Sequence, residues 1–335
     1  MRRPSGQPLQ RSSEMKKRPG ADRRGRFLDV PCRILLACMV LCRSAGSPAQ
    51  EAPVPWGAAA CGSPVAADEC HKSVPIKPAS PDSTRIVDPV AAVLPGEMPW
   101  MVAIGTLSKD KVFSLKCGGS LIHPRWVLTA AHCEIQPDNA VIAGRVDLRE
   151  ASEANKAFVD QAPHWDFSSN TYLFNHDVAL LHLKTPLAYR TIQPDRRPHF
   201  GNVAQVAVRI AGWGSASNKQ PTSVQLMYTD ISTIIDPICK GLYSEYDPRI
   251  ALAPDSFCAI GLSAQNTVSG GSGRVADACS GDSGGPAISP QTGTLVGIVS
   301  WGIGCGAAAL PGVYAGVAEA LPWIEGELKK YGDKW

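Results

Sequence analysis

Short apolar runs separated by glycine, proline and small polar residues recur along the chain from residue 86 to its end. The runs are MPWMVAI (98–104), GGSLI (118–122), RWVLTA (125–130), AVIAGRV (140–146), DVALLHL (177–183), AQVAVRIAGWG (204–214), TLVGIVSWG (294–302) and GVYAGV (312–317). Runs of this length between turn residues are typical of strands, and many of them together favour an all-β barrel or sandwich. Only the last segment, 318–331, has apolar residues near helical spacing: Leu321, Ile324 and Leu328.

The first 85 residues show no such periodicity. Residues 1–33 carry a charge of +7, so the rest of the chain sums to −4 within a total of +3. The basic excess belongs to the start of the chain and does not indicate a nucleic-acid-binding protein. An apolar run of nine residues, ILLACMVLC (34–42), follows it. This run is too short for a membrane-spanning helix but long enough for an export signal.

Three parts of the chain follow from these patterns. We expect residues 1–49 to be a signal or leader segment and residues 50–85, rich in proline and alanine, to be a propeptide or linker. Residues 86–335 then form the folded domain. The expected location is secreted, extracellular or periplasmic, without a stable membrane anchor. The alternative for the first segment is a disordered basic tail followed by a buried helix.

The eleven cysteines support export. Cys32, Cys38 and Cys42 lie in the leader, and the remaining eight are an even number, as four disulfides in an oxidising compartment would require. Zinc binding is the alternative, but the chain contains no CxxC pair. We therefore expect no metal and no cofactor.

Three separate segments carry residues that together could activate a serine. A serine hydroxyl is a poor nucleophile until a base accepts its proton, and that base is usually a histidine oriented by a carboxylate. TAAHC (129–133) contains His132, NHDVALLHL (175–183) contains Asp177, and GDSGGP (281–286) contains Ser283. Each segment alone is a weak signal, because a turn or a strand end explains it equally well. Their order along the chain, His, Asp and Ser, is specific.

These segments resemble those of the chymotrypsin/trypsin family of serine endopeptidases over residues 86–335. The resemblance implies two six-stranded antiparallel β-barrels with a C-terminal α-helix. It implies that His132 is general base and then acid, that Asp177 orients it, and that Ser283 attacks the peptide carbonyl. The backbone N–H groups of Gly281 and Ser283 would form the oxyanion hole. By the same analogy the disulfides are Cys117–Cys133, Cys239–Cys258 and Cys279–Cys305, which leaves Cys61 and Cys70 to pair with each other.

The resemblance also implies a specificity pocket. Asp277, six residues before Ser283, would form its floor, and Ser300, Trp301, Gly302 and Gly312 would form its walls. A buried carboxylate in an open slot favours a cation, so cleavage is expected after Arg or Lys. The alternative is that the aspartate only caps a turn. The expected partners are protein or peptide substrates with Arg or Lys before the scissile bond, and protein protease inhibitors; the chain is expected to be a monomer.

Activation by cleavage is the last implication. Cutting between Arg85 and Ile86 would release an amine that pairs with Asp282. The family usually has two glycines after Ile-Val, where this chain has Asp88 and Pro89, and proline restricts the backbone there. Two rivals remain: a catalytically silent protease-fold binding protein, and a serine protease of non-tryptic specificity.

Overall fold

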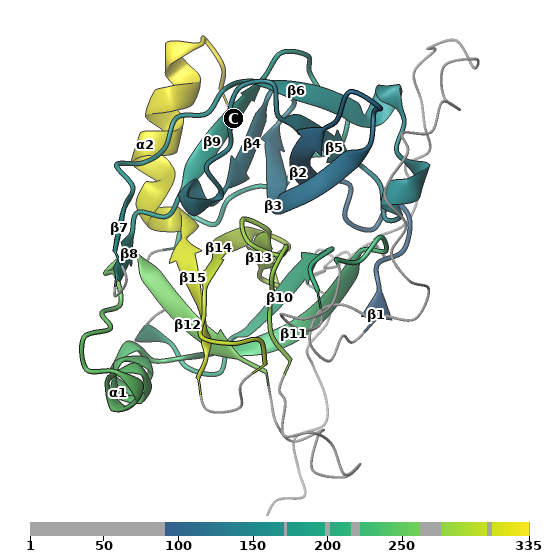
Figure 1. Ribbon diagram of the computed structural model, residues 1–335. Coiled ribbons are helices and arrows are strands. Elements are labelled where there is room, and N and C mark those ends of the chain that lie inside the picture. The colour runs from purple at the N-terminus through teal and green to yellow at the C-terminus, as the bar shows by residue number, and fades with distance from the viewer. Residues whose placement is uncertain are drawn as a thin grey trace, which may run out of the picture. The chain divides into compact units, whose positions relative to one another are not determined.

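Antiparallel strands are the main regular structure of the described chain in this computed structural model (Figure 1). The structure describes residues 91–170, 173–197, 202–215, 222–261, 276–306 and 310–334. The predicted leader, the propeptide, the pair Cys61–Cys70 and the bond Arg85–Ile86 lie outside the described residues. The three-part division of the chain therefore stays a prediction.

The first half of the described chain forms a closed six-stranded barrel in the order β2-β3-β4-β9-β6-β5. Its strands are β2 (Met101–Leu107), β3 (Phe113–His123), β4 (Trp126–Thr129), β5 (Ala140–Ala143), β6 (Lys156–Gln161) and β9 (Ala179–Leu183). A small hairpin, β7 (Ser168–Asn170) and β8 (Leu173–Asn175), precedes β9. β4 is buried along its whole length and pairs with β3 on one side and β9 on the other. This burial explains why RWVLTA reads as an unbroken apolar run rather than an alternating one.

The second half forms the other six-stranded barrel. Its strands are β10 (Ala207–Gly212), β11 (Met227–Ile234), β12 (Ser256–Ile260), β13 (Pro286–Ile288), β14 (Leu295–Trp301) and β15 (Gly312–Gly316). The sheet runs β11-β10-β13-β14-β15-β12 and closes through the β11–β12 pairing, while β1 (Ala91–Ala92) adds to the free side of β11. Two six-stranded antiparallel barrels with a C-terminal helix confirm the predicted fold class.

The described residues include two α-helices and three short 3-10 helices. α2 (Val317–Lys330) follows β15 and runs along the first barrel, with Leu321, Ile324 and Leu328 buried as the sequence predicted (Figure 1). The prediction that only this end is helical was wrong, because α1 (Asp236–Tyr246) lies between β11 and β12. Only Cys239 and Tyr243 of α1 are buried, so the helix has little apolar periodicity to reveal it. The short 3-10 helices are η1 (Ala131–Cys133), η2 (Leu148–Glu150) and η3 (Glu153–Asn155).

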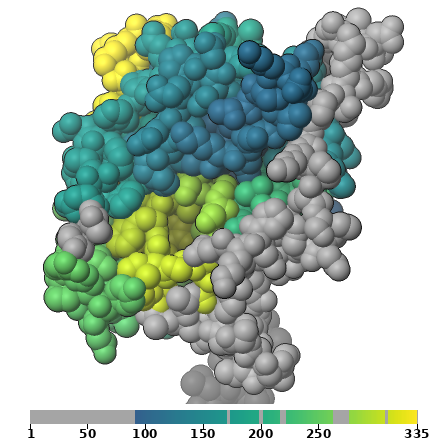
Figure 2. Space-filling view, in the orientation of Figure 1, coloured from purple at the N-terminus to yellow at the C-terminus, as the bar shows by residue number. Residues whose placement is uncertain are grey.

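The surface is hollowed where the two barrels meet (Figure 2). The hollow is lined by residues of both barrels, among them His132 from the first and Ser283 from the second. None of the helices in the described part of the chain is long and apolar enough to cross a membrane.

Candidate active site

The imidazole of His132 is held by a buried carboxylate. η1 begins directly after β4 and places His132 at the edge of the first barrel, and Asp177 opens the segment that leads into β9. The Oδ2 atom of Asp177 lies 2.7 Å from His132 Nδ1, and its Oδ1 accepts the backbone N–H of His132 at 2.8 Å. Ser300, on β14 of the second barrel, donates its hydroxyl to the same Oδ2. Asp177 is only 2% exposed, so these contacts keep its carboxylate in one orientation.

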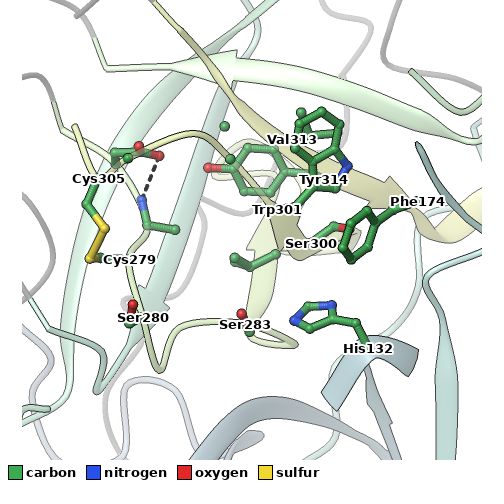
Figure 3. Close-up of a pocket in the computed structure, with 16 residues that line it drawn as sticks. His132, Phe174, Cys279, Ser280, Ser283, Ser300, Trp301, Cys305, Val313 and Tyr314 are labelled. Carbon is green, nitrogen blue, oxygen red and sulfur yellow. Dashed lines mark hydrogen bonds between the residues drawn. A yellow bond between two sulfur atoms is a disulfide. The ribbon is translucent and has the colours of Figure 1, made fainter. Parts of the chain in front are cut away.

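Ser283 sits in a tight loop that both barrels hold. The N–H of Gly118, on β3, donates to the carbonyl of Ser283 at 2.8 Å, and the N–H of Gly284 donates to the carbonyl of Val299, on β14. Gly284 has φ +77°, and a Cβ there would lie 2.1 Å from Thr129 Oγ1, so only glycine fits this turn. His132 and Ser283 line the same cavity, and in Figure 3 the imidazole extends toward the serine.

The backbone around Ser283 presents two N–H groups without acceptors. Within the loop, the N–H groups of Asp282, Gly284 and Gly285 are used in internal hydrogen bonds. Those of Gly281 and Ser283 find no acceptor among the described residues. Gly281 has φ +97°, a conformation that L side chains rarely adopt, and this turn sets the direction of its N–H. Two convergent donors beside a nucleophile can stabilise an oxyanion.

A cavity of about 280 Å³ opens beside Ser283, between His132 and the Cys279–Cys305 disulfide (Figure 3), and an acid, Asp277, is among its lining residues. All five residues predicted to form the pocket line it: Asp277, Ser300, Trp301, Gly302 and Gly312. The Asp277 carboxylate accepts backbone N–H groups from Ala278 at 2.8 Å and Gly306 at 3.0 Å. Burial raises the pKa of Asp277 to about 6. A Cβ on Gly312 would lie 3.0 Å from Asp277 Oδ1, so a side chain there would fill the space before the acid.

Asp282 is a second buried acid and is not among the residues that line the pocket. It is 2% exposed, and its carboxylate accepts the N–H groups of Gly214 at 2.7 Å and Cys279 at 2.9 Å. Burial raises the pKa of Asp282 to about 7. No cation of the described chain pairs with it. A Cβ on Gly214 would lie 2.4 Å from the carboxylate, which shows how tightly the backbone encloses this group.

Phe174, on β8, is a site residue that the sequence analysis missed. Its ring lies edge-on to the His132 ring and stacked with the Trp301 ring, at 6.0 Å between centroids in both cases. The Phe174 and Trp301 rings form an apolar wall beside the imidazole. An aromatic residue three positions before Asp177 was the available signal, but in the sequence it does not differ from a core residue of a strand.

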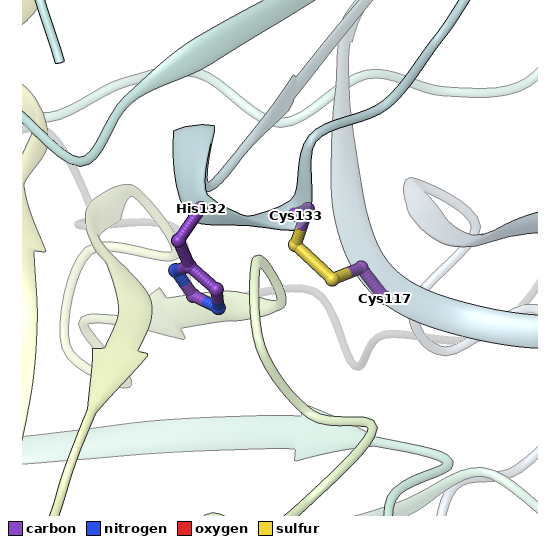
Figure 4. A group of neighbouring side chains, drawn as sticks. All are labelled: Cys117, His132 and Cys133. Carbon is purple, nitrogen blue, oxygen red and sulfur yellow. A yellow bond between two sulfur atoms is a disulfide. The ribbon is translucent and has the colours of Figure 1, made fainter.

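Three disulfides join the described residues: Cys117–Cys133, Cys239–Cys258 and Cys279–Cys305. The first lies against the His132 imidazole (Figure 4). The ligating atoms of Cys117, Cys133 and His132 lie within 4.8 Å of one another, a spacing that would suit a metal ion. The two sulfurs are bonded to each other, however, and a metal requires thiolates. This group is therefore a clip for the His132 turn.

Comparisons with known proteins agree with this geometry. The model of the Trypsin family matches residues 90–324. Transmembrane protease serine 5 from Homo sapiens is 36% identical over 265 residues, covering 73% of this chain and 52% of that protein, so the chain spans about half the length of this relative. The structure of mouse neuropsin, described as a serine protease of the limbic system, has a TM-score of 0.58 and 27% identity. It covers 72% of this chain and 100% of its own.

The fold is thus the chymotrypsin-like double barrel, with a histidine, an aspartate and a serine gathered where the barrels meet. The chain belongs to the trypsin family of serine proteases.

Proposed function

We propose that this chain is a secreted serine endopeptidase that cleaves peptide bonds after Arg or Lys. One observation carries the proposal: Asp177 holds His132 through one hydrogen bond to its imidazole and one to its backbone N–H, and this imidazole shares a cavity with Ser283. A histidine with its Nδ1 bonded to a buried carboxylate leaves Nε2 to accept a proton from an alcohol. Export fits the three disulfides, since such bonds persist in oxidising compartments.

In this mechanism Ser283 Oγ attacks the scissile carbonyl while His132 takes its proton. The N–H groups of Gly281 and Ser283 stabilise the oxyanion, which typically contributes about 10²–10³ in rate for each donor. His132 then protonates the leaving amine, and an acyl-enzyme remains on Ser283. A water molecule, deprotonated by the same imidazole, releases the acid product. Asp177 and Ser300 hold the ring in one tautomer throughout.

Arg/Lys specificity is supported by the charge in the pocket. Asp277 lines the cavity, its carboxylate accepts two backbone N–H groups, and burial raises its pKa to about 6. A guanidinium or ammonium group in the cavity favours the ionised carboxylate and compensates its desolvation. A neutral side chain leaves the acid either protonated or buried without a partner.

Activation by cleavage is supported by the state of Asp282. Its buried carboxylate has a raised pKa of about 7 and no cation of the described chain beside it. An amine on Ile86, released by cleavage after Arg85, would supply the missing positive charge at the base of the Ser283 loop. Because Arg85 fits the proposed specificity, the enzyme would be able to activate itself.

Matched peptides with Arg, Lys, Phe or Ala before the scissile bond test mechanism and pocket together. The matured enzyme should cleave the Arg and Lys peptides, and Ser283→Ala should cleave none. N-terminal sequencing of the active form should find Ile86 first. A preference for Phe would refute the pocket assignment, and full activity in the uncut chain would refute activation. Labelling of Ser283 by a fluorophosphonate separates an enzyme from a silent binding protein.

A further inference from the structure

The residue before Asp177 has a strained backbone. His176 lies in the loop between β8 and β9 and has φ +54°, the left-handed region that non-glycine residues rarely occupy. Such a conformation costs energy and persists only when the surroundings enforce it. Because the His176–Asp177 peptide sets where the Asp177 side chain begins, whatever enforces this conformation also aims the acid at His132.

The contacts of His176 come from both barrels. Its ring stacks on Trp165 with centroids 4.2 Å apart, and its carbonyl accepts the N–H of Val178 at 2.7 Å. Its Nδ1 lies 3.3 Å from the amide nitrogen of Asn175. These contacts are local to the first barrel. The backbone N–H of His176 instead donates to Oδ2 of Asp255, which is 79 positions away and belongs to the second barrel, at 3.1 Å.

Asp255 is well placed to act as a fixed acceptor. It directly precedes β12, and its carbonyl accepts the N–H of Gly316 at 2.7 Å, where β15 passes into α2. Its side chain is buried, with the whole residue 6% exposed. Its own backbone is therefore tied to the second barrel while its carboxylate reaches the first.

A contribution to the stability of the fold does not explain why the carboxylate of Asp255 is buried. Its Oδ1 is buried and has no hydrogen-bond partner among the described residues. Burial raises the pKa of Asp255, and the titratable groups that act on it are His176, which lowers the pKa, and Glu319, which raises it. A buried acid with one satisfied oxygen costs folding energy. The contact that this acid does make is with the residue beside Asp177.

We propose that Asp255 is a positioning residue for Asp177. It acts through the His176 backbone and links the second barrel directly to the loop that carries the acid. The proposal rests on the proposed function, in which Asp177 orients His132. A displacement of about 1 Å in such an array typically costs about 10²-fold in rate, so a distant hydrogen bond can control turnover.

Substitution of Asp255 separates positioning from stability. Asp255→Ala removes the acceptor, and we expect kcat to fall about 10–100-fold while KM for an Arg peptide changes less than about threefold. Asp255→Asn keeps a carbonyl oxygen that can accept the His176 N–H, so kcat should stay within about threefold of the unmodified enzyme. If Asp255→Ala fails to fold, Asp255→Ser serves in its place, because its hydroxyl is too short to reach the N–H.

A proton NMR measurement provides a readout that stability alone would not change. In the inactive Ser283→Ala background, the low-field signal of the His132 Nδ1 proton reports its hydrogen bond to Asp177. Asp255→Ala should shift or broaden this signal at a temperature where the chain is folded, and Asp255→Asn should retain it. The matched control is Asp195→Ala. Asp195 is also buried, but its carboxylate binds Arg197 and Thr294, so its loss should lower the unfolding temperature and leave the signal in place.

An unchanged signal and unchanged kcat in Asp255→Ala would overturn the proposal. So would losses in Asp195→Ala that match those of Asp255→Ala. Absence of turnover in the unmodified chain would instead overturn the proposed function alone, because the NMR comparison is made in a background that needs no activity.

Discussion

The buried carboxylates of the two barrels differ in the hydrogen-bond donors and cations that surround them. In the first barrel the carboxylate of Asp177 has three hydrogen-bond donors on its two oxygens. In the second barrel Asp277 and Asp282 are buried with backbone donors and without a cation of the described chain, and burial raises the pKa of both. The Asp177 carboxylate therefore has its partners within the described chain, one of them Ser300 of the second barrel. The second barrel retains two charges that a substrate and a new amino terminus would neutralise.

In the loop of residues 145–155, in the first barrel, polar side chains are likewise hydrogen-bonded to one another. The side-chain oxygen of Asn155 accepts hydrogen bonds from Arg145 Nε at 2.9 Å and from both the N–H and the hydroxyl of Ser152. Its amide group contacts the hydroxyl of Tyr189. Residues 145–155 are thereby closed by their own side chains. Ligand-dependent chemistry is concentrated in the other barrel, at Ser283 and its two neighbouring acids.

The largest expected effect is the loss of turnover when the proposed nucleophile, Ser283, is removed. Ser283→Ala should lower kcat about 10⁴–10⁶-fold, because the array in the first barrel then has no alcohol to activate. The unfolding midpoint should not change, and Ser289→Ala, a buried serine outside the pocket, should keep full activity. Substantial turnover in Ser283→Ala, measured with purified protein on an Arg peptide, would refute the mechanism.

Removing the pocket charge should be the next largest effect. Asp277→Ser should lower kcat/KM for Arg peptides about 10²–10⁴-fold, since an unpaired buried charge costs about 3–5 kcal/mol. The kcat/KM for peptides with a neutral residue before the scissile bond should fall little. The diagnostic measurement is therefore the ratio of kcat/KM for Arg peptides to kcat/KM for these neutral peptides. A uniform loss for all peptides would mean that Asp277 only supports the loop.

The pH dependence of stability tests the two unpaired acids. Their pKa values, about 6 for Asp277 and about 7 for Asp282, lie above the ordinary value of 3.8. The folded state then binds more protons than the unfolded state between these values, so stability falls as pH rises from about 4 to about 7. At about 1.4 kcal/mol for each pKa unit, Asp277 contributes at most roughly 3 kcal/mol and Asp282 at most roughly 4.5 kcal/mol.

Urea unfolding of the uncut Ser283→Ala chain measures this slope. Adding Asp282→Asn should remove about half of it. Cleavage after Arg85 should flatten the slope as well, because the amine would hold Asp282 in its ionised form. A slope that is the same with Asn at position 282 would contradict the assignment of Asp282 as an uncompensated acid.

The smallest effect concerns the first barrel. Arg145→Ala should lower the free energy of unfolding by about 1 kcal/mol, the usual contribution of one hydrogen bond. A chelator should not shift the unfolding temperature of the unmodified chain, because a guanidinium rather than a divalent cation bridges residues 145–155. A shift of several degrees with EDTA would show that this barrel also depends on a ligand.

Much of the fold was predictable because its strands are short apolar runs with turn residues between them. The prediction placed a strand over 98–104, whereas β2 begins at Met101, since the N–H of Met101 bonds back to Met98 in a turn. β6 and β11 were not predicted, because their polar residues interrupt the apolar pattern in KAFVDQ and MYTDISTI. Helix α1 was missed for the related reason that few of its residues are buried.

The site was predictable only where distinctive sequence surrounds it. His132, Asp177 and Ser283 lie in such segments, and Asp277 and Asp282 could be located by counting from Ser283. Asp255 and Phe174 lie in ordinary strand-edge sequence. Their importance comes from contacts with His176 and His132 that exist only after the barrels have formed, and no local pattern encodes a contact over 79 positions.

Tyr331 and Asp333, which are among the last described residues, contact the first barrel, whose strands come from the first half of the described chain. Asp333 accepts the indole N–H of Trp126 at 2.7 Å, and the Tyr331 ring packs edge-on against the same indole. Synthesis proceeds from the amino end, so the ribosome adds Tyr331 and Asp333 after the strands of both barrels. During synthesis the first barrel, which carries His132, therefore exists for some time without the contacts of Tyr331 and Asp333. During part of that time the Ser283 loop has not yet packed against it.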